Sequence, residues 1–220
     1  GHRAAVRLRR GNQGAVDAHA VEVRAQAADA DEAALALVAL GGLLTAVPAP
    51  FGVRVVPVGT AEELRAAMLT EAPDADVVVM SAAVADFRPA ERASSKIKKT
   101  HDPADPEAAP TIELVRNPDI LVELVRQRGP ASAPIIVGFA AETGDEHGDL
   151  LSYAREKLER KGCDLLVANE VGEGVTFGQD VSTVHLLRRG SEDVRTVGPA
   201  DKSAVAAAVW DAVVAMRAAP

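Results

Sequence analysis

The chain has 220 residues, of which 48% are apolar and only 3% aromatic, so its core must be aliphatic. That length suits one large domain or two small ones. The formal net charge of −8 argues against a nucleic-acid or membrane-surface binder, because both need a basic face. The single cysteine, Cys163, rules out an intramolecular disulfide framework and favours a reducing, cytoplasmic setting. No apolar run approaches the roughly 20 residues of a transmembrane helix, and no signal peptide is expected.

Residues 1–50 form an atypical segment rich in alanine and arginine, and we predict a boundary near residue 51. Few turn signals separate Ala15 from Leu40, so this stretch is interpreted as a helix. The residues from Gly11 to Gly14 are a weak candidate for a phosphate loop, because no strand precedes them. Neither a Walker loop nor a GxGxxG fingerprint occurs, which disfavours a nicotinamide-dependent oxidoreductase.

Strand-like and helix-like runs alternate from residue 51 onward, which predicts a doubly wound α/β domain over residues 51–220. The expected strands are Val53–Val58, Asp76–Met80, Thr111–Val115, Pro134–Phe139, Asp164–Ala168 and Val184–Leu187. The expected helices span about 61–70, 118–128, 153–161 and 204–217. A polar stretch between Pro89 and Pro110 reads as a long loop, and loops of that length are usually functional or disordered.

Two of these helices have clear start signals. Thr60 and Glu63 have the spacing of a capping box. Further along, Asn117 is expected as a helix cap, with Pro118 at the first helical position and Asp119 in the first turn. A helix start of this kind offers free N–H groups to an anion, although an ordinary cap explains the same residues.

Small and charged residues follow the expected strand that ends at Met80. Ligands of open α/β sheets bind beyond the carboxyl ends of strands, and Ala83 would let a ligand approach the backbone there. Asp86 would accept hydrogen bonds, and Lys96 would return over the site to meet a phosphate. The competing interpretation is that Asp86 caps a turn and the lysines are solvated.

Lysine is rare in this chain and unevenly distributed. Only six of the 24 basic residues are lysines, and five of them fall in two tight groups. Lys157 and Lys161 lie four residues apart, so both ammonium groups share one helical face and can address one polyphosphate. A solvated helix face is the alternative, but Lys157 has no acid three or four residues away. Phe139, one of few aromatics, follows a buried strand and would either stack on a nucleobase or pack in the core.

The chain resembles the phosphopantothenate–cysteine ligase family, also called phosphopantothenoylcysteine synthetase, of the bacterial CTP-using type. The resemblance covers about residue 52 to the last residue. It rests on the motifs AAVADFRPAE, KIKK, RNPDIL, VGFAAET and AREKLERKGCDLLVAN, followed by Phe177-Gly-Gln-Asp180. It implies a Rossmann-like, mainly parallel sheet and a CTP-binding synthetase domain. It further implies that 4′-phosphopantothenate is activated as an acyl-cytidylate, with Mg²⁺ assisting, before cysteine attacks.

The same resemblance implies roles for individual residues. Asp86 would contact the nucleotide, Lys96 would meet phosphate and serve in catalysis, and Phe139 would sit against the nucleotide. Lys157 and Lys161 would grip the triphosphate. The helix start would hold CTP through Pro118, Asp119, Ile120 and Leu121. The family is dimeric and is commonly fused to a flavin-dependent decarboxylase domain, which is absent here, so FMN is not expected in this chain.

Residues 1–50 depart from that family. An Asn-x-Ser-Ser-Gly-Lys segment is expected near the start, and Arg10-Gly-Asn-Gln-Gly14 lacks both serines and the lysine. A truncated gene, a shifted reading frame and a divergent variant each account for this difference. The sequence therefore leaves two alternative functions: a CTP-dependent ligase, and a non-catalytic CTP-binding relic or subunit.

Overall fold

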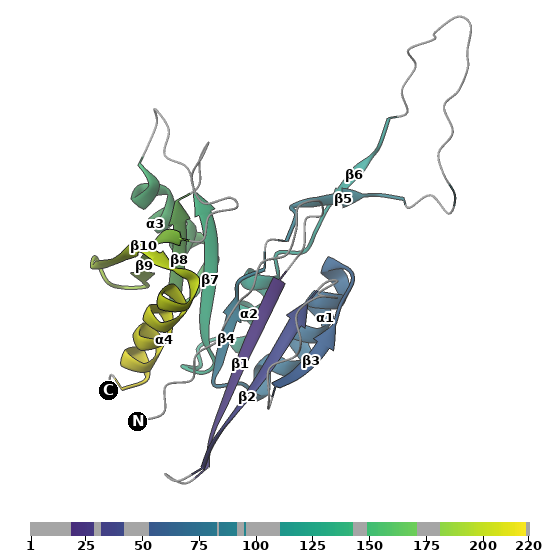
Figure 1. Ribbon diagram of the computed structural model, residues 1–220. Coiled ribbons are helices and arrows are strands. Elements are labelled where there is room, and N and C mark those ends of the chain that lie inside the picture. The colour runs from purple at the N-terminus through teal and green to yellow at the C-terminus, as the bar shows by residue number, and fades with distance from the viewer. Residues whose placement is uncertain are drawn as a thin grey trace, which may run out of the picture.

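The central element is a mixed five-stranded sheet with the strand order β10-β9-β8-β7-β4 (Figure 1). The computed structural model describes residues 19–28, 32–41, 53–82, 84–91, 95, 111–142, 149–170 and 181–218. The strands β4 (Val77–Met80), β7 (Ile135–Glu142) and β8 (Leu165–Glu170) run parallel. The strands β9 (Val181–Arg188) and β10 (Val194–Asp201) continue the sheet in antiparallel fashion. Parallel strands buried on both faces read as continuous apolar runs, which is why VVVM and PIIV were recognisable in the sequence.

Two layers of helix cover the sheet. On one face lie α1 (Ala61–Glu71), α2 (Ile120–Arg128) and α3 (Leu150–Lys161), whose buried residues form one core cluster with the sheet. The other face carries α4 (Lys202–Ala218), which buries Val205, Val209 and Val213 in a second cluster. Helices on both faces of a largely parallel sheet make this an α/β Rossmann-like fold, as the sequence predicts.

The N-terminal residues form strands, so the predicted helix between Ala15 and Leu40 is wrong. The strands β1 (His19–Ala28) and β2 (Glu32–Gly41) pair antiparallel, and β2 pairs parallel with β3 (Val53–Pro57). Apolar and polar residues alternate from Val21 to Gln26, a period-two pattern that belongs to a strand and outweighs the helical propensity of the alanines. Strand β1 also lies beside β4 (Figure 1).

The helices begin where local hydrogen bonds can satisfy their first N–H groups. Helix α1 has the predicted capping box, in which Glu63 N–H donates to Thr60 Oγ1 and the Glu63 carboxylate accepts from the Thr60 N–H. Helix α3 begins at Leu150, three residues before the predicted start, because Asp149 caps it by accepting from the Ser152 N–H. It ends at Gly162, whose φ of 72° is left-handed and suits glycine.

A two-stranded ribbon extends away from the main sheet (Figure 1). Its strands are β5 (Phe87–Pro89) and β6 (Leu114–Arg116), paired antiparallel. The predicted strand at 111–115 therefore lies slightly later than expected, whereas β5 and β10 were not predicted. A short 3₁₀ turn, Ala72–Asp74, follows α1. None of the helices in the described ranges has both the length and the apolar character needed to cross a bilayer.

Candidate functional site

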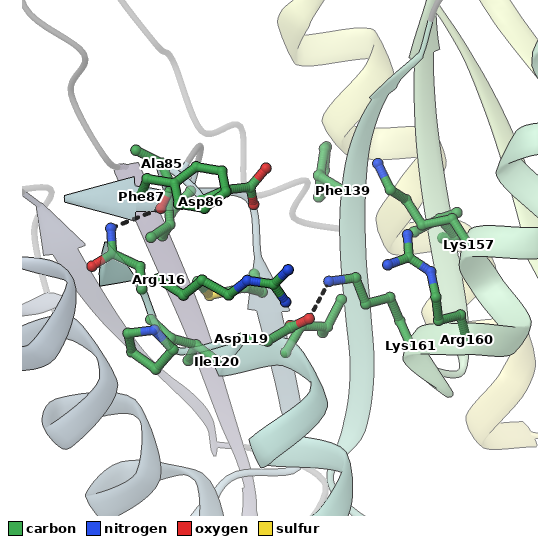
Figure 2. Close-up of a pocket in the computed structure, with 17 residues that line it drawn as sticks. Ala85, Asp86, Phe87, Arg116, Asp119, Ile120, Phe139, Lys157, Arg160 and Lys161 are labelled. Atoms are coloured by element: carbon green, nitrogen blue, oxygen red, sulfur yellow. Dashed lines mark hydrogen bonds and ion pairs between the residues drawn. The ribbon is translucent and has the colours of Figure 1, made fainter. Parts of the chain in front are cut away.

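A cavity of about 440 Å³ opens beyond the carboxyl ends of β4 and β7. Met80 and Leu166 contribute apolar walls from the sheet, and the first residues of α2 form one side. Helix α3 supplies Lys157, Arg160 and Lys161 from the opposite side (Figure 2). This is the place where open α/β sheets bind ligands.

The cavity brings together eight of the residues singled out from the sequence, although they come from four separate segments. The eight are Asp86, Pro118, Asp119, Ile120, Leu121, Phe139, Lys157 and Lys161. The other two, Ala83 and Lys96, lie outside the described residues, as do the loop residues 96–110 and the candidate loop Gly11–Gly14. The eight residues are far apart along the chain, and their shared location in one cavity agrees with the prediction from the sequence.

The start of α2 is shifted from its predicted position. Asp119, not Asn117, is the N-cap, and its Oδ1 accepts from the Val122 N–H at 3.3 Å. Asn117 instead fastens the helix entry to the loop after β4: its Nδ2 donates to the Ala85 carbonyl at 2.8 Å, and its N–H donates to the Asp86 carbonyl at 2.9 Å. Because Asn117 Oδ1 accepts from Arg88 Nη1 at 3.1 Å, it is not used as a cap, and Asp119 caps the helix instead. Two walls of the cavity are therefore tied together at Asn117.

Both lysines of α3 face acids that are distant in sequence. The ammonium nitrogen of Lys157 lies 2.5 Å from Oε1 of Glu142 at the end of β7, and Lys161 forms an ion pair with Oδ2 of Asp119. Their side chains are 28% and 19% exposed, respectively, so these pairs are partly desolvated. The mutual repulsion of two cations on one helical face is thereby offset within the protein.

Two arginines also line the cavity, although the sequence analysis predicted no role for either side chain. Arg116 ends β6, and Arg160 lies on α3 between the two lysines. Within the described ranges neither guanidinium has a hydrogen-bond or ion-pair partner. Four cations and only two acids, Asp86 and Asp119, therefore line the cavity, so it is locally positive in a chain of net charge −8. Arginine is common in this chain, which is why these two did not stand out from composition.

The floor of the cavity depends on a close approach at Gly138 in β7. A Cβ at this position would lie 2.7 Å from Leu121 Cδ2 and 3.3 Å from Cys163 Sγ, so a larger residue would force the Leu121 side chain to move. Phe139, the next residue, is 37% exposed, and its ring borders the cavity (Figure 2). The Phe139 ring is therefore accessible at the rim of the cavity and is not a buried core aromatic.

Cys163 is packed beneath this floor and is fully buried. Desolvation raises the pKa of its thiol to about 11, so the thiolate is not formed at neutral pH. The thiol is therefore a structural side chain of the core and not a nucleophile. No cluster of three or more metal-ligating side chains occurs among the described residues.

The comparisons with known proteins agree with this architecture. Residues 22–216 match the family described as DNA/pantothenate metabolism flavoprotein C-terminal domain. The coenzyme A biosynthesis bifunctional protein CoaBC of Mycobacterium tuberculosis is 50% identical over 173 residues, which are 77% of this chain and 40% of that protein. CoaBC of Vibrio vulnificus is 40% identical over 141 residues, or 64% of this chain and 33% of that protein. The chain thus spans less than half the length of these relatives.

Solved structures give the same result for the fold. The C-terminal domain of a CoaBC protein has a TM-score of 0.59 at 27% identity, covering 82% of this chain and 74% of that one. The DNA/pantothenate metabolism flavoprotein of Streptococcus pneumoniae has a TM-score of 0.62 at 14% identity, covering 90% and 96%, and supports the fold alone. The family resemblance seen in the sequence is therefore confirmed, and the chain belongs to the DNA/pantothenate metabolism flavoprotein C-terminal domain family, together with the matching part of CoaBC.

Proposed function

We propose that this chain ligates 4′-phosphopantothenate to cysteine at the expense of CTP, as the synthetase part of a CoaBC-type protein in coenzyme A biosynthesis. The observation that carries this proposal is the convergence of eight expected nucleotide-binding residues on one cavity. The similarity to proteins named for coenzyme A biosynthesis supports the same assignment.

The proposed reaction has two steps. The carboxylate of 4′-phosphopantothenate attacks the α-phosphorus of CTP, forming the acyl-cytidylate and releasing pyrophosphate. The amine of cysteine then attacks the acyl carbon, loses a proton and releases CMP. Both steps build up or redistribute negative charge on phosphate oxygens, which fixed cations stabilise.

Each wall of the cavity suits one part of that substrate. Lys157 and Lys161 would bind the triphosphate, and Lys96 would meet phosphate in the catalytic step. The N-terminus of α2 directs its N–H groups and the positive end of its dipole at the same space. Phe139 would pack against the nucleobase, and Asp86, whose carboxylate has no ion pair among the described residues, would accept hydrogen bonds from the nucleoside.

The carboxylates present are compatible with Mg²⁺ arriving on the nucleotide. Mg²⁺ usually reaches such sites on substrate phosphates with the help of one or two carboxylates, and it needs no dedicated cage. Asp86 lines the cavity and would complete its coordination, whereas both carboxylate oxygens of Asp119 are already engaged by Val122 and Lys161. When bound, the ion would neutralise part of the triphosphate charge; the protein side chains orient the substrates.

A coupled assay for pyrophosphate tests the proposal. CTP, 4′-phosphopantothenate and cysteine are supplied together, and each is omitted in turn. We expect pyrophosphate release that requires CTP and 4′-phosphopantothenate, and a product that also requires cysteine. Equal release with ATP in place of CTP would remove the nucleotide assignment, and no release under any condition would remove the ligase assignment for this chain alone.

A second function is favoured by residues 1–50, which lack the Ser-Ser-Gly-Lys segment expected of a ligase. In that alternative the chain binds CTP without turning it over. Calorimetry distinguishes the two: heat of CTP binding with no pyrophosphate or product would select the binding protein.

We also propose that the chain acts in the cytoplasm as a homodimer and associates with a flavin-dependent decarboxylase domain. The ribbon exposes Phe87 and Leu114, and Ile112 just before β6 is exposed too, with 52%, 56% and 60% of their surfaces accessible; this apolar surface suits contact with a second copy. Sedimentation equilibrium should give twice the mass of the chain, and Leu114→Glu should return the monomer.

A further inference from the structure

The four cations of the cavity fall into two classes. Lys157 and Lys161 are already paired with Glu142 and Asp119, whereas Arg116 and Arg160 have no partner within the described residues. An incoming anion must therefore displace or share a carboxylate at either lysine. At the arginines it meets a cation that is free to bind.

The two arginines occupy opposite walls of the cavity. Arg116 extends from the ribbon side toward α3, and Arg160 points into the cavity from α3 itself (Figure 2). The backbone at Arg116 is held in place, since Arg88 Nη1 donates to its carbonyl at 2.8 Å. Helix α3 is anchored by buried Ala154 and Leu158, which fixes the position from which Arg160 projects.

Guanidinium groups are well suited to such a role. A guanidinium presents a planar fork of donors that can bind two phosphate oxygens at once, and its charge persists at all accessible pH values. Both arginine side chains are exposed. The free protein therefore does not bury an unpaired charge before a phosphate binds.

We propose that Arg116 and Arg160 bind the phosphates of a polyphosphate ligand from two sides, and that they, more than the paired lysines, supply the electrostatic attraction that draws it in. The ligand would be the triphosphate of a nucleotide, so this inference rests on the proposed function for the identity of the nucleoside. The phosphate contact itself is a property of the two arginines and of the cavity charge.

Calorimetric titrations of three probes test this assignment at low ionic strength. The probes are CTP, cytidine and inorganic tripolyphosphate, and the variants are Arg116→Ala, Arg160→Ala and Arg160→Lys. We expect each alanine variant to weaken CTP and tripolyphosphate about tenfold, since a hydrogen bond to a charged group is lost, while cytidine binding stays within about twofold. Arg160→Lys should recover only part of the affinity, because the charge remains and the bidentate fork does not.

The matched control is Arg126→Ala, which removes an exposed arginine of α2 outside the cavity lining. It should bind every probe as the parent protein does, and circular dichroism should show all variants folded. Unchanged CTP and tripolyphosphate affinity in both alanine variants would overturn the inference, whether or not the lysines matter. If the parent protein binds tripolyphosphate through these arginines but not CTP, the inference stands and the proposed function fails; if it binds neither, both fail.

Discussion

The ammonium nitrogen of Lys157 lies 2.5 Å from Oε1 of Glu142, which joins the middle of α3 to the carboxyl end of β7. That oxygen is buried, so water screens the ion pair only weakly. Glu142 therefore places a negative charge beside a cation that we expect to hold phosphate. The carboxylate and a ligand phosphate must compete for the same ammonium group.

Glu142→Gln should therefore tighten binding of anionic ligands. The substitution keeps the shape of the side chain and removes the competing charge, so we expect tripolyphosphate and CTP to bind roughly three- to tenfold more tightly at low salt, as a single partly screened charge would allow. Calorimetric titration measures the change. The control is Glu192→Gln: its side chain is 97% exposed and pairs with Arg155 away from the cavity. Equal tightening in the control, or none in Glu142→Gln, would contradict the competition.

Lys157→Ala and Lys96→Ala should each reduce ligase turnover by two orders of magnitude or more if these residues stabilise the charge that develops on phosphate. The measurement is the rate of pyrophosphate release at saturating CTP, 4′-phosphopantothenate and cysteine. Lys202→Ala serves as control, because Lys202 begins α4 and does not line the cavity. Turnover close to that of the parent protein in both variants would refute the assignment of these two residues.

Asp164 should be one of the most sensitive positions for stability. Its Oδ2 pairs with Arg128, whose side chain is only 4% exposed, and accepts the Ile136 N–H at 2.8 Å. Asp164→Ala would leave a buried guanidinium unpaired, at a cost of about 3–5 kcal/mol in the free energy of unfolding. Urea denaturation measures this cost.

Arg189 offers the matching control, since it contacts the same carboxylate at 3.2 Å but is 46% exposed. Arg189→Ala should cost less than about 1 kcal/mol, as expected for a solvated ion pair. Similar losses in the two variants would show that burial of Arg128 does not set the cost.

The Cys163 thiol should be unreactive in the folded protein at pH 8 and reactive in urea, which a thiol reagent such as dithionitrobenzoate can follow at this single cysteine. Folding raises the pKa of this thiol to about 11, against about 8.5 when unfolded. The stability linked to its protonated form is thus complete below about pH 8 and lost as the pH rises toward 11.

Cys163→Ser removes this titration and is the control for urea denaturation between pH 8 and 10.5. The parent protein should lose more stability over that interval than the variant does. Rapid labelling under native conditions would show instead that the thiol is accessible.

Elements with strong local signals were predictable from the sequence. The apolar runs of β4, β7 and β8, the capping box at Thr60 and the glycine at the end of α3 depend on neighbouring residues only, and the structure has them. Strand β10 was not predicted because Gly198 and Pro199 interrupt its pattern and none of its residues is buried. The N-terminal hairpin was not predicted because its high alanine content favours a helix, whereas the alternation from Val21 onward favours a strand.

The location of the candidate site was predictable, but its internal pairing was not. Strand ends and helix starts mark one edge of an α/β sheet, so Asp86, Phe139 and Lys157 could be expected together. The partner of Lys161, however, is Asp119, which lies 42 residues away in the sequence. Such a pair depends on how α2 and α3 dock on the sheet, and no local spacing encodes it.

The bridge made by Asn117 has a mechanical consequence. Because its side chain donates to the Ala85 carbonyl and its N–H donates to the Asp86 carbonyl, these two residues are held against the entry to α2 and form one wall of the cavity with it. Helix α3 forms the opposite wall, and the ion pair of Lys161 with Asp119 joins the two walls across the cavity. A ligand that breaks this ion pair would separate the two walls. The same contact therefore governs both ligand binding in the cavity and the motion of α3.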